Sequence, residues 1–166
     1  MPRIDLTTRV SATPEAVFDA CLDVDLHTTS MGASGERATG GVTTGRLSAG
    51  DVVTWQARHF GLPWRMTVRI TDHQRPHRFV DEQTSGPFAR WRHEHLFAPD
   101  PADPSVTIMR DRIEFGAPMG PAGALVARVV LRPYLRRLIA RRNVFLAEAL
   151  VSRAGGRRRR GNGTRP

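Results

Sequence analysis

Alternating apolar and polar residues dominate the middle of the chain and predict β-strands. In one such segment Trp64, Met66, Val68 and Ile70 alternate with polar side chains. Side chains two positions apart on a strand share a face, so this segment has one buried and one solvated face. The same period, interrupted by short turns, predicts further strands over residues 3–10, 42–47, 51–60, 78–84, 88–97 and 106–115. Strands at this spacing indicate an antiparallel meander.

Helical signals follow the first predicted strand. Thr13 is a residue type that caps helix N-termini, and Pro14 suits the first helical position, so a short helix is expected there. A second short helix is expected over residues 23–31, followed by a loop rich in glycine and serine over residues 32–41. A proline-rich loop is expected over residues 98–105, between the last two strands.

A long amphipathic helix is predicted over residues 122–152. Its apolar side chains fall within an arc of about 100° of a helical wheel, whereas most of its arginines lie outside that arc. Pro133 lacks a backbone N–H and crowds the preceding turn, so we expect a kink near Leu131. The apolar stripe indicates a helix packed on the sheet, and its members are Leu131, Tyr134, Leu135, Leu138, Phe145 and Ala149.

The composition predicts one domain over residues 1–152, large enough to form a core without disulfides. The single cysteine, Cys21, excludes an intramolecular disulfide and fits a reducing compartment. The sequence has no apolar leader at its N-terminus and no apolar run that suits a membrane span. These features predict a cytoplasmic protein.

The formal net charge of +9 is concentrated at the C-terminus. The last fourteen residues, 153–166, contain six arginines and no acidic residue, which leaves the rest of the chain near +3. That value is ordinary for a globular domain and does not indicate a nucleic-acid-binding body. We expect the tail to be disordered because it has almost nothing apolar to bury. One alternative function is an interaction module whose basic tail contacts RNA, DNA or an anionic membrane.

Residues 91–97 carry the pattern that is most informative about function. The odd positions hold Trp91, His93, His95 and Phe97, so two imidazoles lie between two aromatic rings on one face. A strand that only packs would carry valine or isoleucine there. We therefore expect this face to line a cavity that accepts a small molecule.

The same alternation predicts which side chains face inward. A register slip of one residue would bury five guanidinium groups, at several kcal/mol for each unpaired charge. We expect outward positions for Arg65, Arg69, Arg90, Arg92 and Arg110. We expect inward positions for Trp64, Met66, Val68, Trp91, His93, His95, Met109, Asp111, Leu135, Leu138 and Phe145.

The order of elements and several local motifs resemble the SRPBCC (START-like, helix-grip) superfamily. The motifs are Ala12-Thr13-Pro14-Glu15-Ala16-Val17-Phe18-Asp19, Phe79-Val80-Asp81-Glu82-Gln83, Gly86-Pro87-Phe88, Trp91, His93-Glu94-His95, Phe97 and Met109-Arg110-Asp111. The resemblance covers residues 2–152 and points to the bacterial branch described as polyketide cyclase/dehydrase-like or ligand-binding. It implies an α+β fold in which a curved antiparallel sheet of six to seven strands wraps a long C-terminal helix around a cavity, with two short helices after the first strand.

The pattern and the resemblance together predict a carrier or sensor that binds a small hydrophobic molecule in an internal cavity. Candidate ligands are a lipid, a quinone and a polyketide-like aromatic. The candidate ligand-binding residues are Trp55, His59, Trp64, Asp81, Gln83, Trp91, His93, His95, Met109, Asp111 and Leu138.

A cyclase or dehydratase is the alternative, with His93 and Asp111 as catalytic residues and His95 or Gln83 polarising a carbonyl oxygen. If the loop between the last two strands centres near residues 101–102, His93 faces Met109 or Asp111, and His95 faces Met109 or Thr107. Asp111 is then within reach of His93. A carboxylate beside an imidazole fixes its tautomer and raises its pKa, as acid–base catalysis requires. The same pair also suits ligand binding or a structural role.

His93 and His95 also have a spacing found in metal sites, with Asp111 as a possible third ligand. No further ligand is evident nearby in the sequence, and the resembling branch implies no metal. The sequence therefore predicts neither a metal nor another cofactor.

Overall fold

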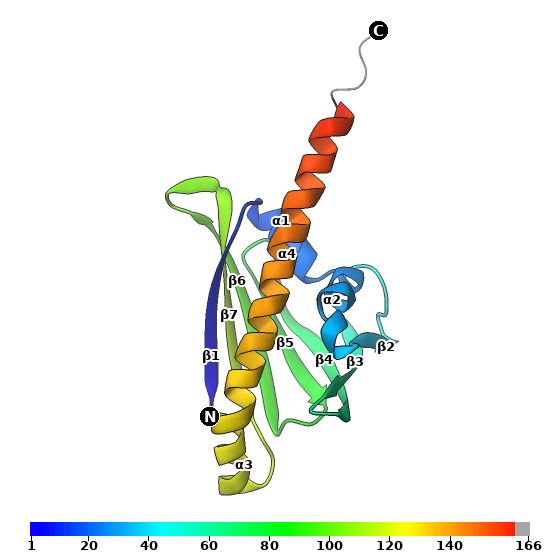
Figure 1. The fold of residues 1–166 in the computed structure, drawn as a ribbon, viewed down its shortest axis with the longest axis vertical. Helices are drawn as coiled ribbons and strands as arrows, with labels where there is room; N and C mark the ends of the chain where they lie inside the picture. The colour runs from blue at the N-terminus through cyan, green and yellow to red at the C-terminus, as the bar shows by residue number, and fades with distance from the viewer. Residues whose placement is uncertain (162–166) are drawn as a thin grey trace.

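The computed structural model describes residues 1–161, with side chains described as far as Arg153. One seven-stranded antiparallel sheet curves around a long C-terminal helix (Figure 1). This confirms the expected α+β helix-grip architecture. In the spatial order β1-β7-β6-β5-β4-β3-β2, the strands are β1 (Arg3–Val10), β7 (Asp103–Gly116), β6 (Arg90–Asp100), β5 (Arg78–Ser85), β4 (Leu62–Gln74), β3 (Val52–His59) and β2 (Arg37–Gly41).

Two short helices connect β1 to β2, as predicted. In α1 (Pro14–Cys21) the hydroxyl of Thr13 accepts a hydrogen bond from the Ala16 amide at 3.4 Å. In α2 (Val24–Ser30) the carboxylate of Asp23 accepts one from the Leu26 amide at 2.9 Å. Each cap satisfies an amide that the first helical turn leaves without a partner.

The C-terminal helix is disturbed where Pro133 predicts it. After α3 (Gly120–Val126), the segment Ala127–Leu131 is π-helical, and α4 (Arg132–Gly161) follows. The Arg132 amide donates to the Ala127 carbonyl, five residues back. The wider turn accommodates the proline ring next to residues 127–131 and appears in place of a sharp bend.

The segment after α2 differs from the prediction. The strand expected over residues 42–47 is absent there, and β2 lies in the stretch that was expected to be a loop. Residues 45–47 instead hydrogen-bond to the α1–α2 junction, since the Leu47 amide donates to the Leu22 carbonyl at 3.0 Å. A Cβ at Gly41 would lie 1.9 Å from the Val52 carbonyl oxygen, so the glycine allows the edge strand to approach β3 closely.

The register between β6 and β7 also corrects the prediction. The turn is centred where expected, with Asp100 opposite Asp103, but it is shorter than the loop predicted over residues 98–105. An irregularity beside Asp100 then shifts the pairing along β7. His95 therefore faces Asp111 and His93 faces Ile113.

The predicted inward side chains are all buried or half-buried, those of the strands on the helix side of the sheet and those of α4 on the face toward the sheet. Four of the five predicted outward arginines are exposed, namely Arg65, Arg69, Arg90 and Arg110. The exception, Arg92, is half-buried and lies 3.7 Å from the Glu82 carboxylate. That partner explains how its guanidinium is accommodated.

We expected the C-terminal helix to end at residue 152, but α4 continues to Gly161. Residues 162–166 lie outside the described part of the chain, as do the side chains from residue 154 onward. The disorder of residues 162–166 and the contact of the 153–166 tail with RNA, DNA or an anionic membrane therefore remain predictions. Within residues 1–161, no helix combines the length and apolar character that a membrane crossing requires.

Candidate ligand-binding cavity

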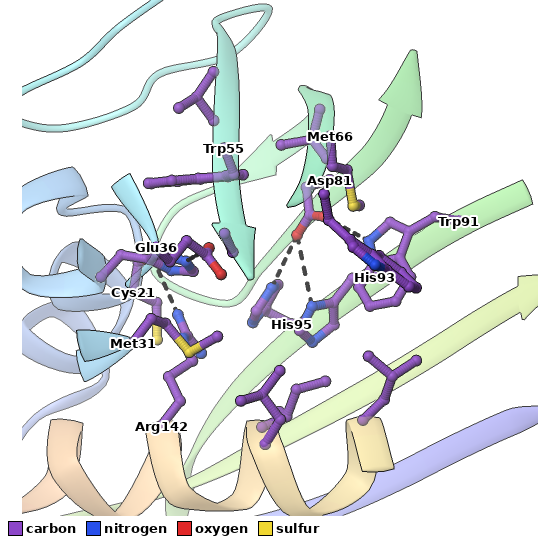
Figure 2. A pocket seen from close by; sticks show the side chains of 18 of the residues that line it. Cys21, Met31, Glu36, Trp55, Met66, Asp81, Trp91, His93, His95 and Arg142 are labelled. Carbon is purple, nitrogen blue, oxygen red and sulfur yellow. Dashed lines mark hydrogen bonds and ion pairs between the residues drawn. The ribbon is translucent and has the colours of Figure 1, made fainter. Parts of the chain in front are cut away.

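A cavity of about 160 Å³ lies between α4, α2 and the concave faces of β3 to β6 (Figure 2). Its walls are mostly apolar. Eight predicted ligand-binding residues line it: Trp55, His59, Trp64, Asp81, Trp91, His93, His95 and Leu138. The alternation of the strands places seven of these side chains on the face that curves toward the helix, and Leu138 faces them from α4.

The other three predicted residues lie outside this lining. Gln83 clamps the backbone of Phe88, donating to its carbonyl at 2.7 Å and accepting from its amide at 3.3 Å. Met109 is fully buried, and its sulfur lies 3.6 Å from the Cys21 sulfur. Asp111 is also fully buried and lies behind the two histidines.

Three polar side chains meet on the sheet wall of the cavity. Asp81 on β5 is paired directly with His93 on β6, and His95 follows on the same face. The Asp81 Oδ2 atom lies 3.1 Å from His95 Nε2 and 3.7 Å from His93 Nδ1 (Figure 2). The Trp91 indole donates to Asp81 Oδ1 at 3.1 Å and so orients the carboxylate. We call Asp81, His93 and His95 the polar wall.

Asp111 supports the polar wall from behind. Its Oδ1 lies 2.9 Å from His93 Nε2, so the contact predicted between these residues is present. The same oxygen lies 3.1 Å from His95 Nδ1, although the two are not aligned for a hydrogen bond. The Asn143 amide on α4 donates to Asp111 Oδ2 at 2.7 Å. Each imidazole thus presents one nitrogen to Asp111 and the other to Asp81.

The four charged or titratable groups shift one another's pKa values. Burial and the neighbouring His95 ring lower the pKa of His93. Burial also opposes the charged form of His95, but the neighbouring carboxylates of Asp111 and Asp81 outweigh it and raise the pKa of that ring. Burial raises the pKa of the Asp81 and Asp111 carboxyls, whereas the neighbouring imidazoles lower it. The imidazoles outweigh burial, so both pKa values lie below the usual range, and that of Asp111 lies well below it. Of the two imidazoles, His95 is therefore the one whose charged form the surroundings favour.

Arg142 is a charged group that α4 contributes to the opposite wall. It is only 5 % exposed, and its Nε atom has no hydrogen-bond partner among the described residues. Its terminal nitrogens donate at 3.4 Å to the Cys21 carbonyl and to the Asn143 side chain. No carboxylate within residues 1–153 lies within ion-pair distance of it. The cavity therefore has one buried cation without an anionic partner.

Arg142 was not among the site residues predicted from the sequence, although its position carries a signal. Position 142 is seven residues after Leu135 and four after Leu138, so it falls in the apolar stripe of the helix. His27, Glu36 and Tyr134 in the cavity lining were not predicted as site residues either.

These missed residues hold two other polar contacts at the cavity. His59 Nδ1 lies 2.7 Å from the Tyr134 hydroxyl, and burial lowers the pKa of His59. His27 Nε2 lies 2.8 Å from Glu36 Oε1, and its ring stacks on Trp55. His59 is thus hydrogen-bonded to Tyr134, and His27 to Glu36, across the cavity lining.

A groove on the surface adjoins the cavity and shares Tyr134 and Leu138 with it. Exposed arginines from β3 and α4, namely Arg58, Arg137 and Arg141, line this arginine groove. A concentration of positive charge beside the cavity favours the approach of anions.

Several solved structures share the fold. A protein from Thermus thermophilus superposes with a TM-score of 0.67 at 16% identity, over 89% of this chain and 99% of that one. The Zhui aromatase/cyclase from Streptomyces superposes with a TM-score of 0.61 at 18% identity, over 98% of this chain and 99% of that one. A START superfamily protein from Mycobacterium smegmatis superposes with a TM-score of 0.61 at 14% identity, over 91% of this chain and 95% of that one. At these identities the likeness shows the fold alone.

The family comparison covers nearly the whole chain. No protein with a curated description matches the sequence. The model of the family described as polyketide cyclase / dehydrase and lipid transport matches residues 1–151. Together with the helix-grip fold, this match shows that the chain belongs to the polyketide cyclase/dehydrase and lipid transport family of the SRPBCC superfamily.

Proposed function

We propose that this protein is a carrier or sensor that binds a small, largely apolar acid in the cavity. The observation that carries the proposal is Arg142, a buried guanidinium on the wall of an apolar cavity, without a carboxylate partner in the described chain. Burying an unpaired charge costs several kcal/mol. A ligand carboxylate offsets this cost through charge-assisted hydrogen bonds to the guanidinium.

The size of the cavity narrows the class of ligand. A dry cavity of about 150 Å³ admits benzene, so about 160 Å³ accommodates a substituted aromatic ring or a short acyl chain. Among the classes predicted from the sequence, polyketide-like aromatic acids and short fatty acids combine such a body with a carboxylate. A quinone lacks the carboxylate. The arginine groove supports the same choice because it attracts anions to the cavity.

Matched ligand pairs test the proposal. Calorimetric titration compares benzoate and 2-naphthoate with their amides, and octanoate with octanamide, all in the presence of a chelator that removes metal ions. We expect at least one acid to bind with one-to-one stoichiometry and its amide to bind more weakly. Arg142→Met, which keeps an unbranched apolar chain but removes the guanidinium, lowers the affinity for the acid by about 10–100-fold. Arg141→Met, an exposed neighbour on the same helix, serves as the control.

Equal affinities for the acid and its amide, or an unchanged affinity for the acid in Arg142→Met, would overturn the proposal that the ligand is an acid bound by Arg142. Failure of every probe to bind would overturn ligand binding by this class of small molecule.

A cyclase or dehydratase is the second candidate, and the contact between His93 and Asp111 favours it. His93 lies on the cavity wall with its Nε2 atom beside Asp111, which leaves Nδ1 as the basic nitrogen on the side of Asp81. There Nδ1 accepts a proton from a carbon next to a carbonyl group, while the positive charge favoured on the neighbouring His95 ring stabilises the enolate oxygen. The substrate in this scheme is an enolisable polyketide-like ketone.

Hydrogen–deuterium exchange at the α-carbon of acetophenone tests this chemistry by NMR. The wild-type protein accelerates the exchange and His93→Ala abolishes the acceleration, whereas His59→Ala retains it. No acceleration by the wild-type protein, or an unchanged rate in His93→Ala, speaks against the catalytic assignment.

A further inference from the structure

We propose that the polar wall, Asp81, His93 and His95, is a binding site for one divalent transition-metal ion of the Zn²⁺ or Fe²⁺ class. The remaining coordination position of this ion faces the cavity. The inference goes beyond the proposed function, because binding of an acid at Arg142 requires no metal.

The first support is the spacing of the donor atoms. Asp81 Oδ2 lies 3.1 Å from His95 Nε2 and 3.7 Å from His93 Nδ1, and donor atoms of all three residues lie within 4.8 Å of one another. Bonds of about 2.0–2.1 Å in a tetrahedral shell place donors roughly 3.3 Å apart. The three donors thus already have nearly the spacing that a bound ion requires.

The second support is that rigid elements hold these donors. All three lie on the paired strands β5 and β6, in the middle of the sheet. The His95 ring stacks on Phe79 with 4.1 Å between ring centroids, and the Trp91 indole donates to Asp81 Oδ1. Little conformational freedom remains to be lost when an ion binds.

The third support is the carboxylate behind the histidines. Asp111 Oδ1 lies 2.9 Å from His93 Nε2 and 3.1 Å from His95 Nδ1, which are the ring nitrogens that face away from Asp81. Histidines that bind metals usually donate the other ring N–H to such a carboxylate, which fixes their tautomer. The hydrogen bond from Asn143 holds Asp111 in turn. The structure therefore contains both the ligands and the group that orients them.

The charge of the polar wall and its access to the cavity also favour a bound cation. An ion that binds here displaces the proton from His95, so the site then holds two neutral imidazoles and two buried carboxylates, whose two negative charges one divalent cation neutralises. All three proposed ligands line the cavity, so a water molecule or a polar group of the cavity ligand completes the coordination. Two imidazoles and one carboxylate with open positions are the ligand set of mononuclear iron sites and of catalytic zinc sites. The sequence analysis considered Asp111 as the third ligand, whereas the geometry assigns that position to Asp81.

The experiment is a titration of the metal-free full-length protein with Co²⁺ and Zn²⁺. We expect one equivalent of Co²⁺ to bind and to give the visible absorption of a four- or five-coordinate ion, which Zn²⁺ then displaces. Asp81→Ala and His95→Ala remove this absorption. His59→Ala, a cavity histidine outside the polar wall, retains it. Asp111→Asn weakens the affinity by about 10–100-fold, as loss of the group that orients the ligands does elsewhere.

X-ray absorption of the Zn²⁺-loaded wild-type protein provides a readout that does not depend on variants. It is expected to show two imidazoles and oxygen donors around the ion. Less than one equivalent bound, a shell without two imidazoles, or equal affinity in wild-type, Asp81→Ala and His95→Ala proteins would overturn the proposal. Because the acid titrations contain a chelator, a failure here leaves their outcome unaffected.

Discussion

The two halves of the sheet meet the helical layer differently. In the packed half, formed by β1 and β7, Ile4, Ile113 and Phe115 have no exposed surface and contact the C-terminal helix. In the open half, formed by β3 and β4, the inward side chains Trp55 and Met66 are only half-buried and border the cavity. Figure 1 shows α4 running beside β1, while α2 lies over the strands of the open half.

The difference shows how one sheet provides both a core and a binding site. β-branched and aromatic side chains close the packed half, as dense interiors require. Large inward side chains that stay half-buried mark the place where helix and sheet separate. The polar wall lies on β5 and β6, between the two halves, so its groups receive support from the core and also border the cavity.

The largest expected effect is on the alkylation rate of Cys21, which borders both the core and the cavity. Burial raises the pKa of its thiol to about 12. The thiolate is the reactive species, so at pH 8 alkylation by iodoacetamide is expected to be roughly a thousandfold slower than for a free thiol. Mass spectrometry follows the reaction, with urea-unfolded protein as the control. Rapid alkylation of the folded protein would show that the junction of the two halves is open to solvent.

The next largest effect is expected on the free energy of unfolding when Asp111 is replaced. Asp111→Ala leaves His93 Nε2 and the Asn143 amide without the carboxylate that both contact, and it removes one of the two carboxylates beside His95. We therefore expect a loss of about 3–5 kcal/mol in the free energy of unfolding. Asp5→Ala removes an exposed carboxylate that pairs with Arg3, and we expect it to cost less than about 1 kcal/mol. Urea denaturation measures both. Similar losses would mean that Asp111 does not tie the polar wall to the helix.

Truncation of one side chain in each half tests the comparison itself. Ile113→Ala in the packed half is expected to cost about 3 kcal/mol, because it leaves a cavity in a closed core. Met66→Ala in the open half is expected to cost about 1 kcal/mol, because its side chain already borders empty space. Urea denaturation again gives both values. Equal costs would contradict the division into a packed and an open half.

Arg142→Met is the one substitution expected to cause no loss of stability. The guanidinium makes only long hydrogen bonds in a buried position, so its replacement by an apolar side chain of similar length leaves stability unchanged or raises it by up to about 2 kcal/mol. Thermal unfolding of the ligand-free variant tests this. A marked loss of stability would assign Arg142 a structural role.

Most of the fold could be predicted from the sequence because periodicity reports which face of an element is buried. The exceptions have physical causes. β2 is rich in glycine and lacks apolar alternation, and Gly41 is required by its close approach to β3. The register of β6 and β7 shifts at an irregularity beside Asp100, which counting from the turn does not reveal.

The candidate site was only partly predictable. His93, His95 and Asp111 are found together because strand alternation determines their faces. The position of Asp81 opposite His93 depends on the β5–β6 register, which the sequence does not indicate. Arg142 was missed because a charged residue was assumed to face solvent, although its helical position lies within the apolar stripe.

Calorimetry with a cavity-filling variant tests the central claim most directly. Ala57 on β3 is buried and lines the cavity, so Ala57→Phe places a ring in the space that we assign to the ligand. The acid that binds the wild-type protein most tightly is titrated into both proteins, with a chelator present and folding verified by circular dichroism. We predict one-to-one binding to the wild-type protein, with the negative heat-capacity change of apolar burial, and no binding to the folded variant. Unchanged binding to Ala57→Phe would contradict the assignment of the cavity as the ligand site.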